Sequence, residues 1–190
     1  MEILIVLWLL FFISHSVLAT PSVKAYFKIK LKEKFIHYRL YYNIIAAVLL
    51  LLIVLQIFNT KQQFFFEMTL LTYSLGFTLV MAGFIVAQEA FNKMNMRAFF
   101  GLDTAGEESQ GLITEGVYKI VRHPLYFGLF LFLIGLFWII PSEDIALCVV
   151  LSIVYIAIGI EFEEMKLRQT FGEAYKEYAK NKSKFIPFVY

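Results

Sequence analysis

Residues 40–58 read LYYNIIAAVLLLLIVLQIF, a stretch without a single charged side chain. An α-helix rises about 1.5 Å per residue, so about 20 apolar residues carry it across about 30 Å of hydrocarbon. The stretch therefore predicts a transmembrane helix. Four further apolar runs lie at residues 3–19, 68–87, 125–140 and 145–160. The last two are short, so we extend each by one turn into its polar flanks and predict an all-α, polytopic membrane helix bundle with about five transmembrane helices.

The composition of the whole chain agrees with this class. Of its 190 residues 60% are hydrophobic and 18% aromatic, and the mean hydropathy is +0.72, which excludes an ordinary soluble domain. We expect a single membrane domain over residues 1–190, with a three-helix part over residues 1–91. Residues 92–190 then form a second part, with a loop at 92–115 that could act as a lid, two helices and an amphipathic tail that Gly172 breaks.

Cations are distributed unevenly between the apolar runs. Segments 20–39, 92–124 and 161–190 are rich in Lys and Arg, whereas the connections at 59–67 and 141–144 together hold one cation, Lys61. The positive-inside rule therefore predicts an outside amino terminus and a cytoplasmic carboxyl terminus. We interpret the basic segments, including an expected surface helix within 20–38, as anchors on anionic lipid headgroups. We expect no nucleic-acid partner and no obligate protein partner.

A segment with possible binding chemistry precedes the fourth apolar run, where residues 116–128 read GVYKIVRHPLYFG. Pro124 fits the first turn of a helix and biases His123 toward an extended conformation. The positive end of that helix and the neighbouring Arg122 would attract a carboxylate or a phosphate. Gly128 would let a ligand approach the helix backbone. Each residue alone also has a structural explanation, since Arg, Tyr and Gly are common at the ends of membrane helices.

Two adjacent carboxylates, Glu163 and Glu164, follow the fifth apolar run. Carboxylates at the end of a membrane helix are expensive unless something pairs with them. Lys166 and Arg168 lie three and four residues further on and are the local partners. A ligand ammonium or sulfonium is the functional alternative, and the residues alone leave the two open.

The sequence lacks the motifs of several common cofactor-binding and hydrolytic sites. There is no G-x-G-x-x-G, no P-loop, no H-E-x-x-H and no G-x-S-x-G motif. Three scattered His residues and the single Cys148 argue against a metal site and exclude an internal disulfide. We expect Cys148 to serve packing.

Residues 116–128, then residues 163–178 (EEMKLRQTFGEAYKEY), then Phe185-Ile186-Pro187 resemble the isoprenylcysteine carboxyl methyltransferase-like family. That family also includes phospholipid N-methyltransferases and methanethiol S-methyltransferases, which are integral membrane enzymes that use S-adenosylmethionine. The resemblance implies that residues 92–190 bind this cofactor. The implied cofactor-binding residues are Tyr118, Val121, Arg122, His123, Tyr126, Gly128, Glu163 and Glu164, and the implied catalytic residues are Glu164, Arg122 and His123. The paired glutamates would hold the ammonium end of the cofactor.

The expected function is therefore an S-adenosylmethionine-dependent membrane methyltransferase acting on a lipophilic or small thiol or carboxylate acceptor. We expect it in a bacterial or archaeal inner membrane, with the active site facing the cytoplasm. The family's eukaryotic prenylcysteine enzymes carry an arginine before the paired glutamates, where this chain has Ile158-Gly159-Ile160. Two alternatives to the methyltransferase function remain. One is an NADPH-dependent membrane reductase of the sterol-reductase type, a class that resembles this family around the Arg-His-Pro segment. The other is a non-catalytic membrane transport or assembly subunit, with a polar path lined by Ser14, His15, Ser16 and Asn43.

Overall fold

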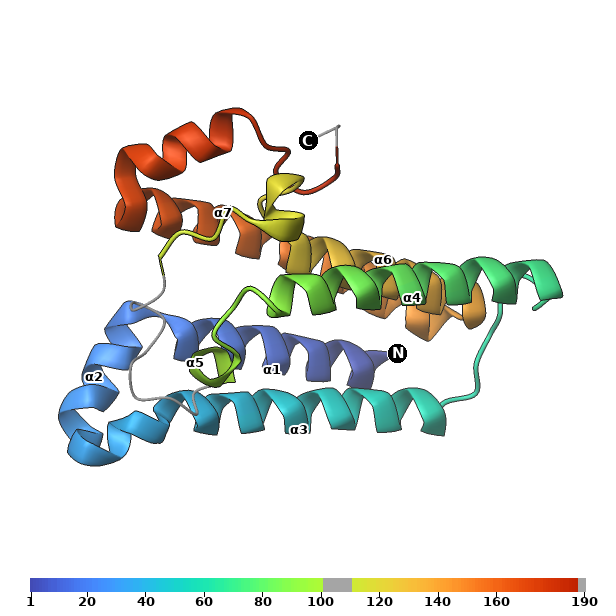
Figure 1. Cartoon of the computed structure of the whole chain (residues 1–190). Helices are drawn as coiled ribbons and strands as arrows, with labels where there is room; N and C mark the ends of the chain where they lie inside the picture. The colour runs from blue at the N-terminus through green and yellow to red at the C-terminus, as the bar shows by residue number, and fades with distance from the viewer. Residues whose placement is uncertain (101–110, 188–190) are drawn as a thin grey trace. The chain divides into compact units, whose positions relative to one another are not determined.

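The computed structural model describes residues 1–100 and 111–187, and most of these residues are helical (Figure 1). In chain order the elements are α1 (Glu2–Ala19), α2 (Pro21–Leu31), η1 (Lys32–His37), α3 (Tyr38–Asn59), α4 (Leu70–Phe91), α5 (Met96–Phe100), η3 (Gly116–Lys119), α6 (Pro124–Ile139) and α7 (Glu143–Lys180). The described residues form no β-strand, only two isolated bridges. The predicted all-α class is confirmed.

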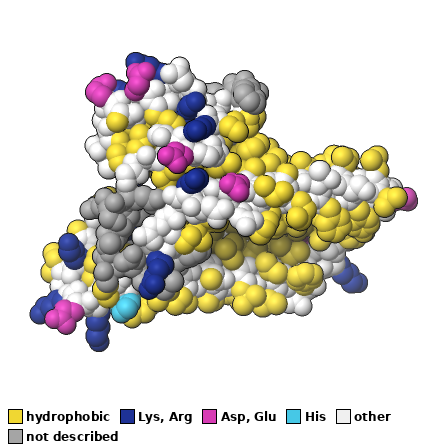
Figure 2. Space-filling model, viewed as in Figure 1, with side chains coloured by type: hydrophobic (Ala, Val, Ile, Leu, Met, Phe, Trp, Pro, Cys, Tyr) yellow, Lys and Arg dark blue, Asp and Glu magenta, His cyan; other side chains and the backbone are white. Residues whose placement is uncertain are grey.

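Each of the five predicted apolar runs forms a helix. α1, α3, α4 and α7 are long and apolar enough to cross a membrane, whereas α6 has only 16 residues. At about 1.5 Å per residue α6 extends about 24 Å, which agrees with its short apolar run. Hydrophobic side chains cover much of the surface of the long helices (Figure 2), and Leu70 and Phe58 are 84% and 79% exposed. Exposed apolar surface on this scale is expected where lipid takes the place of water, so the chain is an integral membrane protein.

One compact unit comprises residues 1–62 together with the described residues 95–100. Within it α1 packs along α3, and α2 and η1 connect the two. The buried Tyr38 donates a 2.9 Å hydrogen bond to the carbonyl oxygen of Leu18, which ties the start of α3 to the end of α1. The basic segment predicted within 20–38 is confirmed as helical, and Pro21 begins α2.

The second compact unit comprises residues 63–94 and the described residues from 111 onward. Its centre is the contact between α4 and α6, where glycines of the two helices face each other. A Cβ atom built on Gly83 would lie 2.5 Å from the carbonyl oxygen of Gly128, and one on Gly76 would lie 2.8 Å from that of Gly135. The absence of side chains at these positions lets the two backbones approach closely, as small residues do between membrane helices.

The two connections that hold few cations meet at one end of this second unit. The backbone N–H of Phe65 donates to the carbonyl oxygen of Pro141 at 2.8 Å, and that of Glu143 donates to Gln63 at 3.0 Å. Residues 63–65 therefore pair with residues 141–143. This pairing agrees with the prediction that both connections lie on the same side of the membrane.

A sharp bend in α7 lies at Gly172, where φ is +54° and ψ is −125°. This backbone conformation is essentially confined to glycine, because a side chain would clash with the backbone. The break predicted at Gly172 is confirmed. Beyond it the helix folds back on its own preceding turns, as the red end of α7 in Figure 1 shows.

The long connection predicted at 92–115 contains the short helix α5. Residues 101–110 of this connection lie outside the described residues. The lid predicted for this segment therefore stays a prediction.

Candidate functional site

The start of α6 positions Arg122 and His123. His123 is the residue before the helix, with φ of −123°, and Pro124 occupies the first helical position, as the sequence predicts. The carboxyl-terminal segment holds the approach to the helix, because the backbone N–H of Arg122 donates to the carbonyl oxygen of Ser183 at 2.9 Å. Val121, which is 2% exposed, forms the adjacent bridge to Ser183. The chain around His123 is thus fixed from both sides.

Both residues meet Glu164, which lies more than forty positions further along the chain. Arg122 Nη1 donates to Oε1 and Oε2 of Glu164 at 2.8 and 2.7 Å, and His123 Nε2 lies 2.9 Å from Oε1. Tyr175, from beyond the bend of α7, donates its hydroxyl to Oε1 at 2.6 Å. Glu164 and His123 are each 3% exposed. We call Arg122, His123, Glu164 and Tyr175 the Glu164 cluster.

The local partner expected for Glu164 is also present, on the outside of the cluster. Arg168 Nη2 lies 3.4 Å from Glu164 Oε2, but its side chain is 60% exposed, whereas that of Arg122 is 12% exposed. A screened surface pair of this kind contributes little, typically below about 1 kcal/mol. The buried partners therefore dominate the electrostatics of Glu164.

Two opposing effects act on the pKa of Glu164, which lies beyond the apolar part of α7. Burial alone raises the pKa, but hydrogen bonds from Tyr175 and His123 and the charge of Arg122 lower it, and the net effect is a pKa below the ordinary value. Glu164 is therefore an ionised carboxylate at neutral pH. Because such a group only accepts hydrogen bonds, the Nε2 atom of His123 carries a proton in this pair.

Glu163 differs from its neighbour in almost every respect. Its side chain is 43% exposed, and its Oε2 lies 3.7 Å from Nδ1 of His123. Nothing in the sequence distinguishes the two adjacent glutamates. In the structure Glu164 is buried beside Nε2 of His123, and Glu163 is partly exposed beside Nδ1 of the same ring. Of the two carboxylates, only that of Glu163 is exposed to partners from outside the chain.

Tyrosines surround the cluster. Tyr178 donates a 2.7 Å hydrogen bond to the carbonyl oxygen of Tyr118. Burial is the main cause that raises the pKa of the Tyr118 hydroxyl, and the charge of Glu163 adds to it. Burial likewise raises the pKa of Tyr178 to about 12. Both phenols are therefore neutral at physiological pH and keep their protons for hydrogen bonding. Tyr126 lies with its ring centroid 5.9 Å from that of His123.

The structure thus brings together most of the residues that the sequence singles out, and it changes the interpretation of one. Around Gly128 the space that a side chain would fill is taken by α4, with Gly83 O at 2.7 Å and Ala87 N at 3.1 Å from a built Cβ atom. The expectation that Gly128 leaves room for a ligand is therefore wrong in its physical reason. The contact partner of this glycine is a helix.

The sequence analysis missed Tyr175 as a member of the site. Tyr175 is 1% exposed, and its hydroxyl makes the shortest hydrogen bond of the Glu164 cluster. The sequence feature that could have identified Tyr175 is the helix break at Gly172. A helix that reverses its direction shortly after the paired glutamates brings the following residues back beside them. The sequence pattern itself places this tyrosine only within the amphipathic tail.

One polar atom of the cluster has no partner within the described part of the chain. Arg122 Nε is buried and makes no hydrogen bond there. A buried guanidinium donor left unsatisfied is unusual and suggests a missing acceptor. Arg122 therefore offers a donor and the partly exposed carboxylate of Glu163 offers an acceptor, a combination that suits a small molecule carrying both charges. Among the described residues no group of His, Cys, Asp and Glu side chains could hold a metal ion.

Comparison with known proteins identifies relatives of this chain. The family model of phospholipid methyltransferases matches residues 71–174. A methanethiol S-methyltransferase of Pseudomonas deceptionensis is 30% identical over 187 residues, covering 94% of this chain and 69% of that protein. The protein-S-isoprenylcysteine O-methyltransferase B of Arabidopsis thaliana is 34% identical over 116 residues, 60% of this chain. The matched part is 58% of the length of that plant relative. No solved structure matches this chain.

Proposed function

The chain belongs to the phospholipid methyltransferase family, and from this premise we propose that it is a membrane enzyme that transfers a methyl group from S-adenosylmethionine to an acceptor. The observation that carries the proposal is the Glu164 cluster. Arg122, His123 and Glu164 all lie within the matched residues 71–174, and they come together where the start of α6 meets the middle of α7. We place the cofactor site there, lined by the residues that the family resemblance implies apart from Gly128, which packs against α4.

The charges at this place fit the amino-acid end of S-adenosylmethionine. We assign its carboxylate to Arg122, because the buried Nε atom still lacks an acceptor within the described chain. The positive end of the α6 dipole adds to this attraction. We assign its ammonium group to Glu163, because this carboxylate is 43% exposed and has room for a partner. The two assignments use groups of opposite charge, one next to His123 in the sequence and the other 3.7 Å from the His123 ring.

Glu164 has a different task in this proposal. Its two oxygens already accept from Arg122, His123 and Tyr175, so it acts through these residues as a positioning residue. It holds the guanidinium in one orientation and fixes the proton of His123 on Nε2. Such supporting contacts are what keep a binding site in its productive geometry.

When bound, S-adenosylmethionine would supply an electrophilic methyl group: the acceptor would form a bond to the methyl carbon as the sulfur–methyl bond breaks, and S-adenosylhomocysteine would leave. The residues of the chain contribute alignment and the exclusion of water. His123 and Val121 are buried and shield one side of the site. The aromatic rings of Tyr118 and Tyr126 offer faces that attract a sulfonium cation. We assign the movement of an acceptor proton to His123 Nδ1, the ring nitrogen that Glu164 does not engage, with Glu163 3.7 Å behind it.

The acceptor that we propose is a lipophilic or small molecule with a thiol or carboxylate group. The names of the relatives point to isoprenylcysteine and methanethiol as substrates of those proteins. We also propose that the site faces the cytoplasm of a bacterial or archaeal cell, since the segments rich in Lys and Arg adjoin it.

Ligand binding to the purified protein tests the proposal. In detergent, S-adenosylhomocysteine should stabilise the chain by RT ln(1 + [L]/Kd), or about 2.7 kcal/mol at a hundredfold excess over Kd. NADPH should produce no shift in the unfolding temperature. Stabilisation by NADPH alone would favour the reductase, and no response to either ligand would favour the transport or assembly subunit.

A further inference from the structure

The segment that follows α7 returns to the approach of α6, and we call its residues 182–186 the strap. The strap forms neither helix nor strand. Its backbone meets the approach to α6 at Ser183, which bridges Val121 and accepts the 2.9 Å hydrogen bond from the N–H of Arg122. A segment without regular secondary structure has few backbone hydrogen bonds of its own, so side-chain contacts must hold it in place. The function proposed above gives the strap no role.

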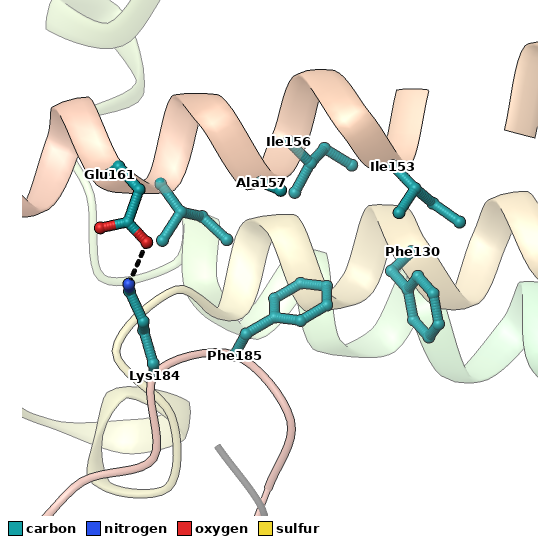
Figure 3. A pocket seen from close by; sticks show the side chains of 8 residues that line it. Phe130, Ile153, Ile156, Ala157, Glu161, Lys184 and Phe185 are labelled. Atoms are coloured by element: carbon teal, nitrogen blue, oxygen red, sulfur yellow. Dashed lines mark hydrogen bonds and ion pairs between the residues drawn. The ribbon is translucent and has the colours of Figure 1, made fainter. Parts of the chain in front are cut away.

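Two side-chain contacts fasten the strap beside the pocket that Figure 3 shows. Lys184 forms an ion pair with Glu161 of α7, and the Lys184 side chain is only 12% exposed. Phe185 packs edge-on against Phe127 and Phe130 of α6, with ring centroids 6.1 and 5.5 Å apart. The strap is thus attached to α7 by charge and to α6 by aromatic packing.

The strap depends strongly on these two contacts because the space beneath it is not filled. Lys184 and Phe185 line a cavity of about 250 Å³ that lies between the strap, α6 and α7. In a close-packed interior many neighbouring atoms would share the task of holding a segment. Here the loss of either contact should loosen the strap and its backbone bond to Arg122.

The strap holds Arg122 at its backbone, whereas Glu164 holds it at the guanidinium. The Arg122 N–H donates to Ser183, and Arg122 Nη1 donates to both carboxylate oxygens of Glu164 at 2.8 and 2.7 Å. Hydrogen bonds weaken steeply away from their favoured distance and angle, so the direction of the guanidinium depends on both ends of the residue. The Nε atom, which we assign to the cofactor carboxylate, lies between these two ends.

We propose that the strap positions Arg122 for cofactor binding, and that Lys184 and Phe185 are the positioning residues through which it does so. The inference rests on the proposed function. It deepens that function, because it adds to the site two residues that lie outside the matched residues 71–174. Neither residue contacts the cofactor in this proposal. Their effect reaches the cofactor through Ser183 and the backbone of Arg122.

Reversal of the charges of the ion pair tests the hold of the strap on Arg122. Lys184→Glu breaks the pair and places two carboxylates together, whereas Lys184→Glu combined with Glu161→Lys restores a pair with its charges exchanged. In the protein without ligand, Lys184→Glu should speed amide hydrogen exchange of the peptide that contains Arg122 by about tenfold, and the double variant should reverse most of this change. The matched control exchanges the charges of Lys180 and Glu177, a pair at 2.7 Å on the exposed surface of the tail, and should change nothing.

Binding of S-adenosylhomocysteine provides the functional measurement. A displacement of about 1 Å can cost an enzyme about a hundredfold, so we expect Lys184→Glu to raise the Kd by about tenfold, and the double variant to restore it. Calorimetry well below the unfolding temperature of each variant separates this effect from a loss of stability. Phe185→Ala should act in the same direction as Lys184→Glu. Ile186→Ala, at a neighbouring position that is 38% exposed, should change the Kd little.

The two measurements distinguish the inference from the proposed function. Faster exchange at Arg122 with an unchanged Kd would show that the strap holds the backbone without positioning the cofactor site. Unchanged exchange would show that the ion pair does not hold the strap. Either result overturns the inference, while binding of S-adenosylhomocysteine by the unaltered protein leaves the proposed function standing. If the unaltered protein does not bind this ligand, the proposed function fails and the positioning role fails with it.

Discussion

Tyr175 donates a 2.6 Å hydrogen bond to Glu164 across the bend that Gly172 makes in α7. The two residues are eleven positions apart, so a continuous helix would separate them by about 16 Å along its axis. The reversal at Gly172 is therefore what completes the Glu164 cluster. The amphipathic tail of the protein is thus part of the candidate site.

The first prediction concerns the hydroxyl of Tyr175. Tyr175→Phe removes a donor to a buried carboxylate, and hydrogen bonds to charged groups are worth about 1.5–3 kcal/mol. We expect a lower free energy of unfolding by that amount, measured by thermal or denaturant unfolding in detergent. Tyr41→Phe, at a position 51% exposed, is the matched control and should change stability by less than about 0.5 kcal/mol. Equal stability of the two variants would mean that the hydrogen bond contributes nothing.

The second prediction concerns the backbone at Gly172. A Cβ atom added there meets no atom within 4 Å, so any cost of Gly172→Ala comes from its positive φ alone. Forcing a residue with a side chain into such a conformation costs about 1–3 kcal/mol, and we expect unfolding to shift accordingly. Gly159→Ala is the control, because this helical glycine has only the Tyr126 hydroxyl at 3.7 Å from a built Cβ atom. Its stability should rise or stay unchanged, since alanine favours helix by about 1 kcal/mol.

Much of this fold could be predicted from the sequence, because membrane helices are specified by local composition. The apolar run at 40–58 and its counterparts correspond to helices within a few residues, and Pro124 and Gly172 mark a helix start and a break where expected. These features depend only on the residues of each segment, and contacts with distant segments do not determine them.

The site was less predictable because it depends on how helices are rotated against each other. Nothing local distinguishes Glu163 from Glu164, and only the packing of α7 beside the start of α6 turns Glu164 toward Arg122. Gly128 was misinterpreted for the same reason, since a glycine that admits a ligand and one that admits a helix look identical in sequence. Long-range packing decides both cases.

A third prediction follows from the lowered pKa of Glu164. A carboxyl group whose folded pKa lies below its unfolded value of about 4.5 contributes stability above that value, and this stability is lost as the pH falls below it. We therefore expect the unfolding temperature to fall as the pH is lowered below about 4.5. Glu164→Gln should have a shallower dependence in that range, because its amide does not titrate. Parallel pH profiles of the two proteins would show that other carboxylates control acid stability.

The fourth prediction tests the orientation in the membrane. Glu67 and Lys180 are exposed, one in the connection between α3 and α4 and the other at the end of α7. In a Cys148→Ser background, Glu67→Cys should react with a membrane-impermeant thiol reagent in intact cells, and Lys180→Cys only after permeabilisation. The reversed pattern would place the Glu164 cluster outside the cell.

The last prediction separates the two adjacent glutamates. Under our assignment Glu163 contacts the ammonium group of the cofactor, whereas Glu164 positions Arg122 and His123. Glu163→Gln should leave the unfolding temperature nearly unchanged, because its side chain is 43% exposed. It should weaken binding of S-adenosylhomocysteine by about tenfold or more, since a lost charged hydrogen bond costs about 1.5–3 kcal/mol.

For Glu164→Gln we expect the opposite pattern: the main effect is a loss of stability, and not a direct loss of a contact with the cofactor. Breaking a buried ion pair leaves the Arg122 guanidinium without its counter-charge, at a typical cost of about 3–5 kcal/mol. Calorimetric titration and thermal unfolding of both variants, with Glu173→Gln at an 87% exposed surface position as the control, measure the two effects separately. If Glu163→Gln bound S-adenosylhomocysteine as tightly as the unaltered protein and Glu164→Gln lost binding without losing stability, the roles of the two carboxylates would be exchanged.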